Sequence, residues 1–423
     1  MEGLAHERCR RAAPPTVTLM LLKLALRNVF RQKGRTAMTL AAIVFGVAGL
    51  IVSGGFIQDV FIQLGDAVVQ SQTGHVQVFR KGFFERGTRH PEKFLIDDAQ
   101  NLSTALARTP GVKQISARLS FAGLLNNGRR DQPIIGEGVE AEKEAALSAY
   151  LKISEGRALN ADDAFGMMAG QGVAKSLGLK VGDRVTLVMN TAAGALNTME
   201  FKLVGVFQSF SQDFDARAIR IPLLAAQQLM GTSGANLLVA VLHRTEDTDR
   251  AHAAIASRLG ERPLEARHWR QLSDFYEKTV QLYERQFGIL QFIILAMVLL
   301  SVVNSVNMNV FERQSEFGTM QALGNRPLEV FRLLLIENAL LGLIGATLGV
   351  IAGVGIALAV SAIGIPMPPP PNANIGYTAF IRVVPATVAS AFFIGLVATV
   401  LAAVFPARRT AKTPIVDALR QGV

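Results

Sequence analysis

FGILQFIILAMVLLSVVNSVNMNVFERQSEFGTMQALGNRPLEVFRLLL, residues 287–335, is the stretch of sequence that decides the fold. No charged side chain stands between Arg285 and Glu312, and a run of that length can cross a hydrocarbon layer about 30 Å thick as one helix. A short charged segment, 311–323, follows, and a Gly-Asn-Arg-Pro break then precedes a second hydrophobic run. This pattern predicts a short amphipathic helix at the membrane surface between two spanning helices.

The composition separates charged from hydrophobic residues along the chain. Of the 423 residues, 50% are hydrophobic and only 18% are charged, and the mean hydropathy is +0.31. Hydrophobic runs occupy the two ends of the chain, and a long polar block occupies the middle. This distribution is typical of an integral membrane protein that carries one large soluble insertion.

The uncharged runs predict an α-helical membrane protein with four transmembrane helices and an inserted extracytoplasmic α+β domain. The predicted spans are residues 36–58, 286–311, 333–363 and 383–407. The segments around them are an amphipathic N-terminal segment (1–35), the inserted domain with its stalk (59–284), the coupling segment (311–324), the Pro-rich loop (364–382) and a basic tail after 407, with 285–423 forming one permease region.

Local patterns support the α+β prediction for the insertion. Strand-like residues 112–125 and 132–139 flank Asn126-Asn127-Gly128, which is a hairpin signal. Residues 218–221 resemble a short strand that leads into a helix over Pro222–Met230, with proline in its first turn. Residues 273–285 are amphipathic, and we expect them to continue into the second span as a stalk.

The basic residues are concentrated beside the hydrophobic runs. The net charge is +10, with lysines and arginines before the first run, at the central break and after the last run. The positive-inside rule then places both termini and the segment 311–324 in the cytoplasm, and the inserted domain on the opposite side. The same placement argues against nucleic-acid binding. The only cysteine is Cys9, which excludes an intrachain disulfide, and Met20 is an alternative start of translation.

Three segments, taken in this order, resemble a known family: LALRNVFRQKGRTAMTLAAIVFGV (24–47), residues 309–350, and FPARRTAKTPIVDALR (405–420). They are similar to FtsX-like and MacB-like permease subunits of the ABC superfamily, which includes macrolide exporters and lipoprotein-releasing permeases of the LolC/LolE type. In the insertion, GQGVAKSLGLKVGDRVTL (170–187) resembles the MacB-like extracytoplasmic domain of that family. The resemblance is strongest over the four spans.

The resemblance implies that the segment 311–324 is a coupling helix seated in a groove of a separate ATPase. The matching residues are Glu312, Arg313, Glu316, Phe317, Gly318, Gln321, Ala322, Leu323 and Gly324. Phe317 stands where the family commonly has isoleucine, and Gln321 where it often has arginine, so the polar contacts with the ATPase are expected to differ. The residues themselves predict an apolar side of Phe317, Met320 and Leu323. The alternative interpretation is a solvated turn with interfacial anchors.

Small and polar residues within the spans suggest how the helices pack. Gly345, Gly349 and Gly353 recur every four residues, so another helix can approach that face closely. Asn304, Asn307 and Asn309 are predicted to form hydrogen bonds between helices, with a substrate path as the less favoured use. Glu337 is predicted to lie near the membrane boundary, where it can reach water, and not to relay protons.

Several chemistries have no support in the sequence. No Gly-x4-Gly-Lys-Ser/Thr phosphate loop occurs, so ATP and Mg²⁺ are expected to be bound by a partner ATPase, and this chain is expected to be non-catalytic and without a cofactor. The six histidines are scattered without metal-ligand spacing, and no serine lies in a Gly-x-Ser-x-Gly context. A metal site and a hydrolase site are therefore not predicted.

The favoured functional hypothesis is an ABC transporter permease of the bacterial inner membrane that acts by mechanotransmission. ATP hydrolysis in the partner would move the periplasmic domain to extract or export a lipoprotein or lipid. A second permease copy or a homologue is expected, because four spans per chain are few for enclosing a pathway, and a periplasmic carrier is a further possible partner. Two alternatives stay open: an FtsX-type signal transmitter that activates a cell-wall hydrolase, and MacB-type efflux of drugs or toxins.

Overall fold

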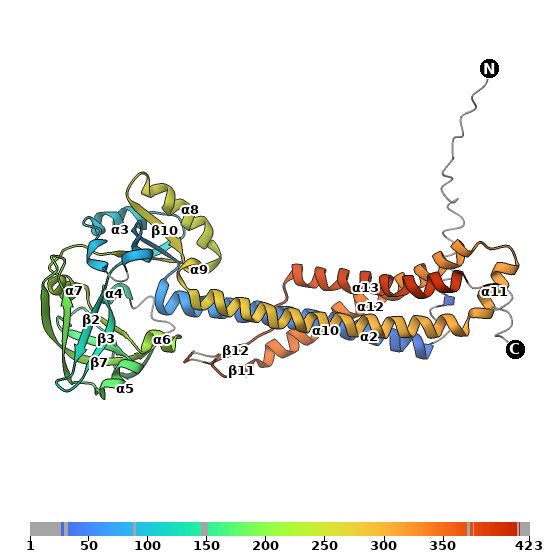
Figure 1. Cartoon of the computed structure of the whole chain (residues 1–423), viewed down its shortest axis with the longest axis horizontal. Coiled ribbons are helices and arrows are strands. Elements are labelled where there is room, and N and C mark those ends of the chain that lie inside the picture. Colours follow the sequence, from blue (N-terminus) through green and yellow to red (C-terminus); the bar gives the residue numbers. More distant parts are fainter. Residues whose placement is uncertain are drawn as a thin grey trace, which may run out of the picture. The chain divides into compact units, whose positions relative to one another are not determined.

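The computed structural model describes residues 27–28, 33–87, 90–144, 151–369, 373–374, 376–412 and 414. Two compact units make up the chain (Figure 1). We name them the helical unit, which comprises Met1–Val60, Leu282–Ile365 and Ala379–Val423, and the sheet unit, which comprises Phe61–Gln281 and Pro366–Thr378. Most of the expected N-terminal amphipathic segment and of the C-terminal tail lies outside the described residues.

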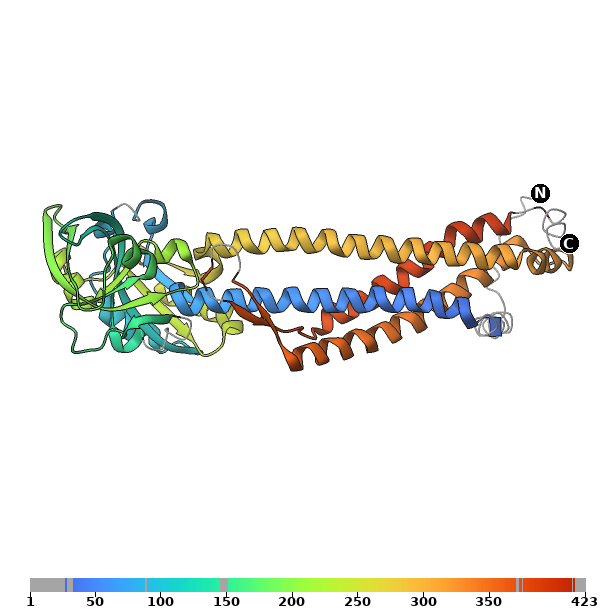
Figure 2. The same ribbon diagram turned by 90° about the horizontal axis from the view of Figure 1, so that it is seen from below.

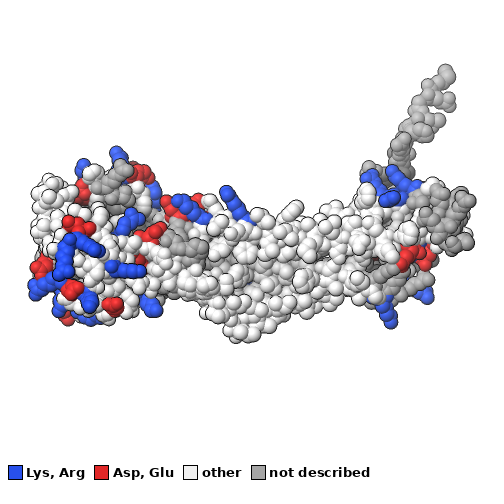
Figure 3. All heavy atoms as spheres, turned by 60° about the horizontal axis from the view of Figure 1, so that its bottom comes forward, with Lys and Arg blue, Asp and Glu red and all other residues white. Residues whose placement is uncertain are grey.

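The long apolar runs form long helices, as their composition predicts. Among the described residues, four helices are long and apolar enough to cross a membrane. They belong to α2 (Lys33–Val68), α10 (Asp274–Glu312), α12 (Pro327–Ile363) and α13 (Pro385–Ala411). Within the helical unit they run alongside one another, and on the face in Figure 3 a broad stretch of this unit carries no charged side chain (Figures 2 and 3). The α-helical membrane class with an inserted α+β domain is confirmed.

Helix α2 continues ten residues beyond the predicted span end at residue 58, and a π-helical turn, η1 (Val69–Thr73), follows it. The reason is burial, because Leu64, Ala67 and Val68 all lie in the interior of the sheet unit. Helix α10 likewise begins at Asp274, so the predicted stalk and the second span are one continuous helix.

Helix α13 passes through Pro406 and continues beyond residue 407, the predicted end of the fourth span. Proline cannot donate a backbone hydrogen bond, but it is tolerated in membrane helices where neighbouring groups compensate. Pro406 is buried, and the Thr410 hydroxyl donates to its carbonyl oxygen at 3.0 Å. The helix carries on to Ala411, and Arg408 and Arg409 fall in its last turn.

The sheet unit is built on one mixed sheet of ten strands within the described part of the chain. Its strand order is β10-β1-β9-β2-β3-β8-β5-β7-β4, and β6 pairs with both β2 and β7. The strands are β1 (Val76–Arg80), β2 (Val112–Asn126), β3 (Asp131–Val139), β4 (Lys152–Gly156), β5 (Gly166–Gly170), β6 (Arg184–Asn190), β7 (Leu196–Gln208), β8 (Ala218–Pro222), β9 (Leu237–Leu242) and β10 (Leu264–His268). The helices are α3 (Ala99–Ala107), α4 (Ala141–Glu144), α5 (Gln171–Leu177), α6 (Gln212–Asp215), α7 (Leu223–Met230), α8 (Thr248–Leu259) and α9 (Trp269–Leu272).

The predicted hairpin and strand–helix pair are confirmed. Strands β2 and β3 are antiparallel neighbours from Arg118↔Val139 to Asn126↔Asp131. Gly128 in their turn has φ = +84°, a conformation that favours glycine. Strand β8 runs directly into α7, whose first residue follows Pro222.

Two hydrophobic clusters form the main interior of the sheet unit. One cluster joins β2, β3 and β5–β8 to α5 and α7 through residues such as Phe121, Leu187 and Phe201. The other joins β1, β2 and β9 to α3 and α8 through residues such as Leu106 and Ile255. Figure 1 shows α8 beside β10 and α7 beside β2.

The Pro-rich loop between α12 and α13 contains two short strands. Strands β11 (Ile365–Met367) and β12 (Tyr377–Ala379) pair with each other, and Pro370 and Pro371 lie outside the described residues. Between these strands, Ala373 forms an isolated antiparallel bridge with Ser211. The loop therefore packs on the sheet unit of its own chain.

Candidate functional site

The predicted coupling segment forms a compact elbow between α10 and α12. Helix α10 ends at Glu312, and the short helix α11 (Gln314–Ala322) follows after Arg313 alone. Gly324, with φ = +99°, then turns the chain, and Pro327 opens α12. The Glu329 carboxylate accepts a hydrogen bond from the Arg326 N–H at 3.0 Å and so caps this start.

A buried ion pair closes the base of this elbow. Arg313 Nη1 donates to Glu337 Oε2 at 2.8 Å, and Asn28 Nδ2 donates to Glu337 Oε1 at 2.7 Å. Arg313 also pairs with Glu316 at 3.0 Å, and its guanidinium lies 5.0 Å from the centre of the Phe317 ring. Glu337 is only 4% exposed, so it does not reach water as predicted. Its charge is compensated inside the protein instead, which joins α11 to α12.

The structure divides the nine predicted coupling residues between the interior and the surface. Arg313, Phe317 and Gly318 are buried within the helical unit. Gln321 is half-buried, and the exposed residues are Glu312, Glu316, Ala322, Leu323 and Gly324. The predicted apolar side is therefore split, because Phe317 belongs to the interior whereas Leu323 faces outward.

Large apolar side chains are exposed around the elbow. Leu323 is 83% exposed, Phe311 66% and Leu328 57%. Leu323 and Leu328 lie on either side of the turn that follows α11. This turn lies in the charged segment between the two uncharged runs that are long enough to span a membrane. Exposed apolar patches with a polar surround are typical of a surface that contacts another protein or the membrane.

The three predicted packing glycines of α12 all lie against α2. A Cβ atom placed on Gly345 would meet Ile43 at 2.9 Å, and one on Gly349 would meet Val47 at 2.7 Å. One on Gly353 would meet the Ala48 backbone at 3.0 Å. The missing side chains thus permit a helix separation that larger residues would prevent.

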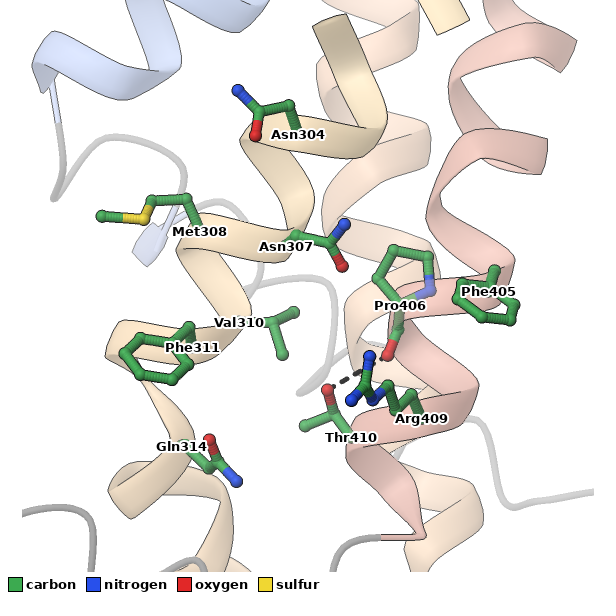
Figure 4. A pocket seen from close by; sticks show the side chains of 10 residues that line it. All are labelled: Asn304, Asn307, Met308, Val310, Phe311, Gln314, Phe405, Pro406, Arg409 and Thr410. Atoms are coloured by element: carbon green, nitrogen blue, oxygen red, sulfur yellow. Dashed lines mark hydrogen bonds between the residues drawn. The ribbon is translucent and has the colours of Figure 1, made fainter. Parts of the chain in front are cut away.

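The asparagines near the end of α10 do not serve the predicted purpose. Among the described residues, Asn304, Asn307 and Asn309 form no side-chain hydrogen bond to another helix, and Asn309 Oδ1 is buried without a partner. Asn304 and Asn307 are exposed and line an open groove of about 560 Å³ between α10 and α13 (Figure 4). Arg409 and Thr410 line the groove on the α13 side.

A second charged cluster lies in the sheet unit, and the sequence analysis did not predict it. Arg118 on β2 pairs with Glu144 at 2.7 Å, and Arg220 on β8 pairs with Glu137 at 3.0 Å. Contacts of 3.6 Å connect Arg118 with Glu137 and Arg220 with Glu144. Burial opposes the ionisation of Glu144, but the charges of Arg118 and Arg220 offset it, and its pKa is lowered. Arg118 and Glu144 are therefore both held in their charged forms.

This cluster holds the end of the first long helix. Arg118 Nη1 donates to the carbonyl oxygen of Gln72 at 2.6 Å, and Arg220 Nη2 donates to that of Ser71 at 3.1 Å. Both carbonyls belong to η1, which continues α2 into the sheet unit. The signal in the sequence is a lone charge inside each apolar strand, as in ISARLSF (115–121) and AIRIP (218–222).

Among the described residues, no group of three or more His, Cys, Asp or Glu side chains could hold a metal ion. The charged clusters of both units instead pair acids with arginines. These ion pairs connect different secondary-structure elements of the same unit.

Comparisons with known proteins agree with this architecture. The family model of the MacB-like periplasmic core domain matches residues 36–258, and that of the FtsX-like permease C-terminal region matches residues 288–415. The lipoprotein-releasing system transmembrane protein LolE of Haemophilus influenzae is 25% identical over 60% of this chain and 63% of its own length, so the chain spans just under two thirds of that relative. LolC of Neisseria meningitidis is 24% identical over 96% of this chain and 98% of its own length.

Two further comparisons involve MacB proteins. The macrolide export ATP-binding/permease protein MacB of Hyphomonas neptunium is 25% identical over 94% of this chain and 60% of its own length. The crystal structure of the periplasmic region of MacB from Actinobacillus actinomycetemcomitans matches 50% of this chain and 94% of that one, with 15% identity and a TM-score of 0.35. The family models account for more than half of the chain. The chain therefore belongs to the family of ABC transporter permeases that combine a MacB-like periplasmic core domain with an FtsX-like permease region.

Proposed function

We propose that this permease is driven by a separate ATPase that binds the elbow formed by α11 and its flanking turns, residues 311–324. The observation that supports this most directly is Leu323, which is 83% exposed beside the turn at Gly324. An apolar side chain at such a tip gains stability when a partner's groove covers it. The acids Glu312 and Glu316 on the same segment are exposed and add charge to the contact.

The elbow is suited to transmit movement because its base is fixed. The Arg313–Glu337 pair and the buried Phe317 attach α11 to the start of α12. A displacement of α11 would then move α10 and α12 together instead of bending the connection. ATP and Mg²⁺ would be bound by the ATPase, and the permease chain would be non-catalytic.

The proposed topology places both termini and the elbow in the cytoplasm and the sheet unit in the periplasm of a bacterial inner membrane. The placement of basic residues beside the spans supports this orientation. We further propose that two permease chains, identical or homologous, assemble with the ATPase, because one chain offers four candidate spans in its described part.

The cargo that we propose is a lipoprotein or another lipid. The LolC relative, whose name states a lipoprotein-releasing system, matches this chain over nearly its whole length. Efflux of the kind named for the MacB relatives, and signalling to a cell-wall hydrolase, are the competing functions. ATPase stimulation of the purified complex by a lipidated protein, compared with its unlipidated form, separates the first function from the other two.

Cross-linking tests the proposed ATPase contact. A photoreactive amino acid at Leu323 is expected to cross-link to the ATPase in the assembled complex. The matched control is Ile363, at the opposite end of α12, which is 87% exposed and equally apolar. Cross-linking from both positions, or from Ile363 alone, would contradict the proposal. So would labelling of a Leu323→Cys variant by a membrane-impermeant reagent added outside intact cells.

A further inference from the structure

The sheet unit carries a polar groove of about 590 Å³, a volume in the range of ligand-binding sites. We name it the basic groove. The turn between β2 and β3 forms one side of it, and residues 175–184, from the end of α5 to the start of β6, form the other. Strands β2 and β6 bring these segments together, because Asn126 pairs with Thr186 close to the turn.

Hydrogen bonds hold the backbone of the basic groove in place. Asn127 Nδ2 donates to the carbonyl oxygen of Leu177 at 2.7 Å, which attaches the β2–β3 turn to the end of α5. Asn127 Oδ1 accepts the backbone N–H groups of Arg129 at 3.0 Å and of Arg130 at 2.8 Å. Leu177 and Leu179 anchor the opposite side, because both are buried in the interior of the sheet unit. The exposed side chains of the groove therefore extend from a fixed backbone.

The charged side chains that line the basic groove are mostly cationic. They are Arg129, Arg130, Lys175 and Arg184, with one acid, Asp183, among the described lining residues. Arg184 is compensated by Glu200 at 2.9 Å, and Arg130 donates to the neutral carbonyl group of Ser176 at 3.5 Å. In the described part of the chain, the exposed side chains of Arg129 and Lys175 form no hydrogen bond or ion pair. The basic groove therefore offers positive charge that the chain itself does not compensate.

The local backbone argues against a compact oxyanion as the ligand. Phosphate is commonly held by backbone N–H groups or by the N-terminus of a helix. Here the N–H groups of Gly128, Arg129 and Arg130 already donate to asparagine side chains. Helix α5 presents its C-terminal end, where Gly178 closes the helix and the carbonyl groups carry partial negative charge. The cations of the basic groove are thus separate side chains on different segments, and they suit an anion whose charges are also separate.

We propose that the basic groove binds an acidic segment of a partner protein, whose carboxylates pair with Arg129, Arg130 and Lys175. Charge complementarity of this kind selects the partner and accelerates its association. A second copy of this chain in a two-fold contact would instead bring the same cations together, which charge repulsion opposes. The proposal depends neither on the ATPase contact nor on a lipid cargo.

The test is photo-cross-linking of an octaglutamate peptide, labelled with benzophenone, to the purified full-length chain. Mass spectrometry then maps the attachment sites, which are expected at residues 127–130 and 175–184. The double variant Arg129→Gln/Lys175→Gln is expected to reduce cross-linking at these residues about tenfold, because two ion pairs are lost. Cross-links that avoid these residues would overturn the proposal.

The matched control is the double variant Arg262→Gln/Lys113→Gln. It also removes one arginine and one lysine that are exposed and form no side-chain ion pair in the described chain, but Arg262 precedes β10 and Lys113 lies at the opposite end of β2. It is expected to change cross-linking in the basic groove less than twofold. Equal losses in the two double variants would reduce the effect to overall charge and overturn the proposal. Equal melting temperatures establish that both variants fold.

Competition experiments distinguish the other occupants. Inorganic phosphate, and phosphatidylglycerol in mixed micelles, are expected to displace the peptide no more than sodium chloride of the same ionic strength does. Stronger displacement by either one would assign the basic groove to a phosphate-bearing ligand and overturn the proposal. Disulfide formation between Ser176→Cys chains in a Cys9→Ser background would assign it to a second copy, with the same consequence.

Discussion

The end of α2 and the loop between α12 and α13 are both attached to the sheet unit, but through different chemistry. Two buried arginines hold the α2 end by donating to the carbonyls of Ser71 and Gln72. The loop is held by Asn374, whose side chain donates to Asp215 Oδ2 at 2.6 Å and whose backbone N–H donates to Phe210 O at 3.0 Å.

The two attachments differ in how their charged groups respond to pH. At the α2 end, two arginines and two glutamates compensate one another. At the loop, Asp215 is a single buried carboxylate, and burial raises its pKa to about 6 although its hydrogen bonds and Arg220 act in the opposite direction. The Glu144 carboxylate of the first attachment is therefore held in its charged form, whereas Asp215 of the second attachment can be protonated in a mildly acidic medium.

The largest effect is expected from breaking the α2 attachment. Arg118→Met leaves Glu144 buried beside one arginine instead of two, and should lower the free energy of unfolding by about 3–5 kcal/mol. Unfolding can be followed by the fluorescence of Trp269, the only tryptophan, which is buried in the sheet unit. The control Arg184→Met removes an exposed ion pair to Glu200 and should change stability by about 1 kcal/mol or less. Equal effects would contradict the role given to the buried cluster.

A smaller effect on the free energy of unfolding is expected from a change in pH. Asp215 and His75 contribute to it with opposite sign. The raised pKa of Asp215 makes the folded state bind more protons than the unfolded state between about pH 4 and 6, so its contribution to stability is lost as pH rises through 6. Burial lowers the pKa of His75 to about 4, so its contribution is lost as pH falls from 6.5 towards 4. Each contribution is roughly 3 kcal/mol at most.

Single variants should separate these two contributions. In Asp215→Asn, only the contribution of His75 remains, so the protein should become more stable as pH rises from 4 to 6.5. In His75→Gln, stability should instead fall as pH rises from 4 to 6. The measurement is urea unfolding of each variant across this range, and identical pH slopes in the two variants would refute the assignment.

The smallest effect is expected from loosening the loop. Asn374→Ala removes one donor from the Asp215 carboxylate and should cost about 1–2 kcal/mol, while the pKa of Asp215 rises further. Asn101→Ala is the matched control, because Asn101 makes a similar 2.6 Å contact with Asp98 at the exposed surface. If Asn374→Ala is no more destabilising than Asn101→Ala, the loop attachment contributes little to stability.

Periodicity and charge placement predicted the architecture because they depend on local sequence alone. The uncharged runs, the β2–β3 hairpin and the continuous stalk of α10 were all predictable in this way. The helix ends were less predictable. Whether α2 ends near residue 58 or at Val68 depends on burial of Leu64 and Ala67 by the sheet unit, which local sequence does not reveal.

The candidate site was predictable in location and only partly in its contacts. The segment 311–324 stands out in the sequence, yet nothing local indicates that Arg313 turns inward to Glu337, 24 positions away. The asparagines of α10 suggested interhelical hydrogen bonds because polar residues in membrane helices usually find partners. Asn304 and Asn307 instead line an open groove between α10 and α13.

The sequence by itself determined which segments can enter a membrane and where charge is excluded, since hydrocarbon selects residues by their own polarity. Only the tertiary structure decided which charges meet. Arg118, Glu137, Glu144 and Arg220 come from different elements, and their pairing depends on the order in which β2, β3 and β8 lie in the sheet. Charges separated along the chain compensate one another only when folding brings them together in a medium of low dielectric constant.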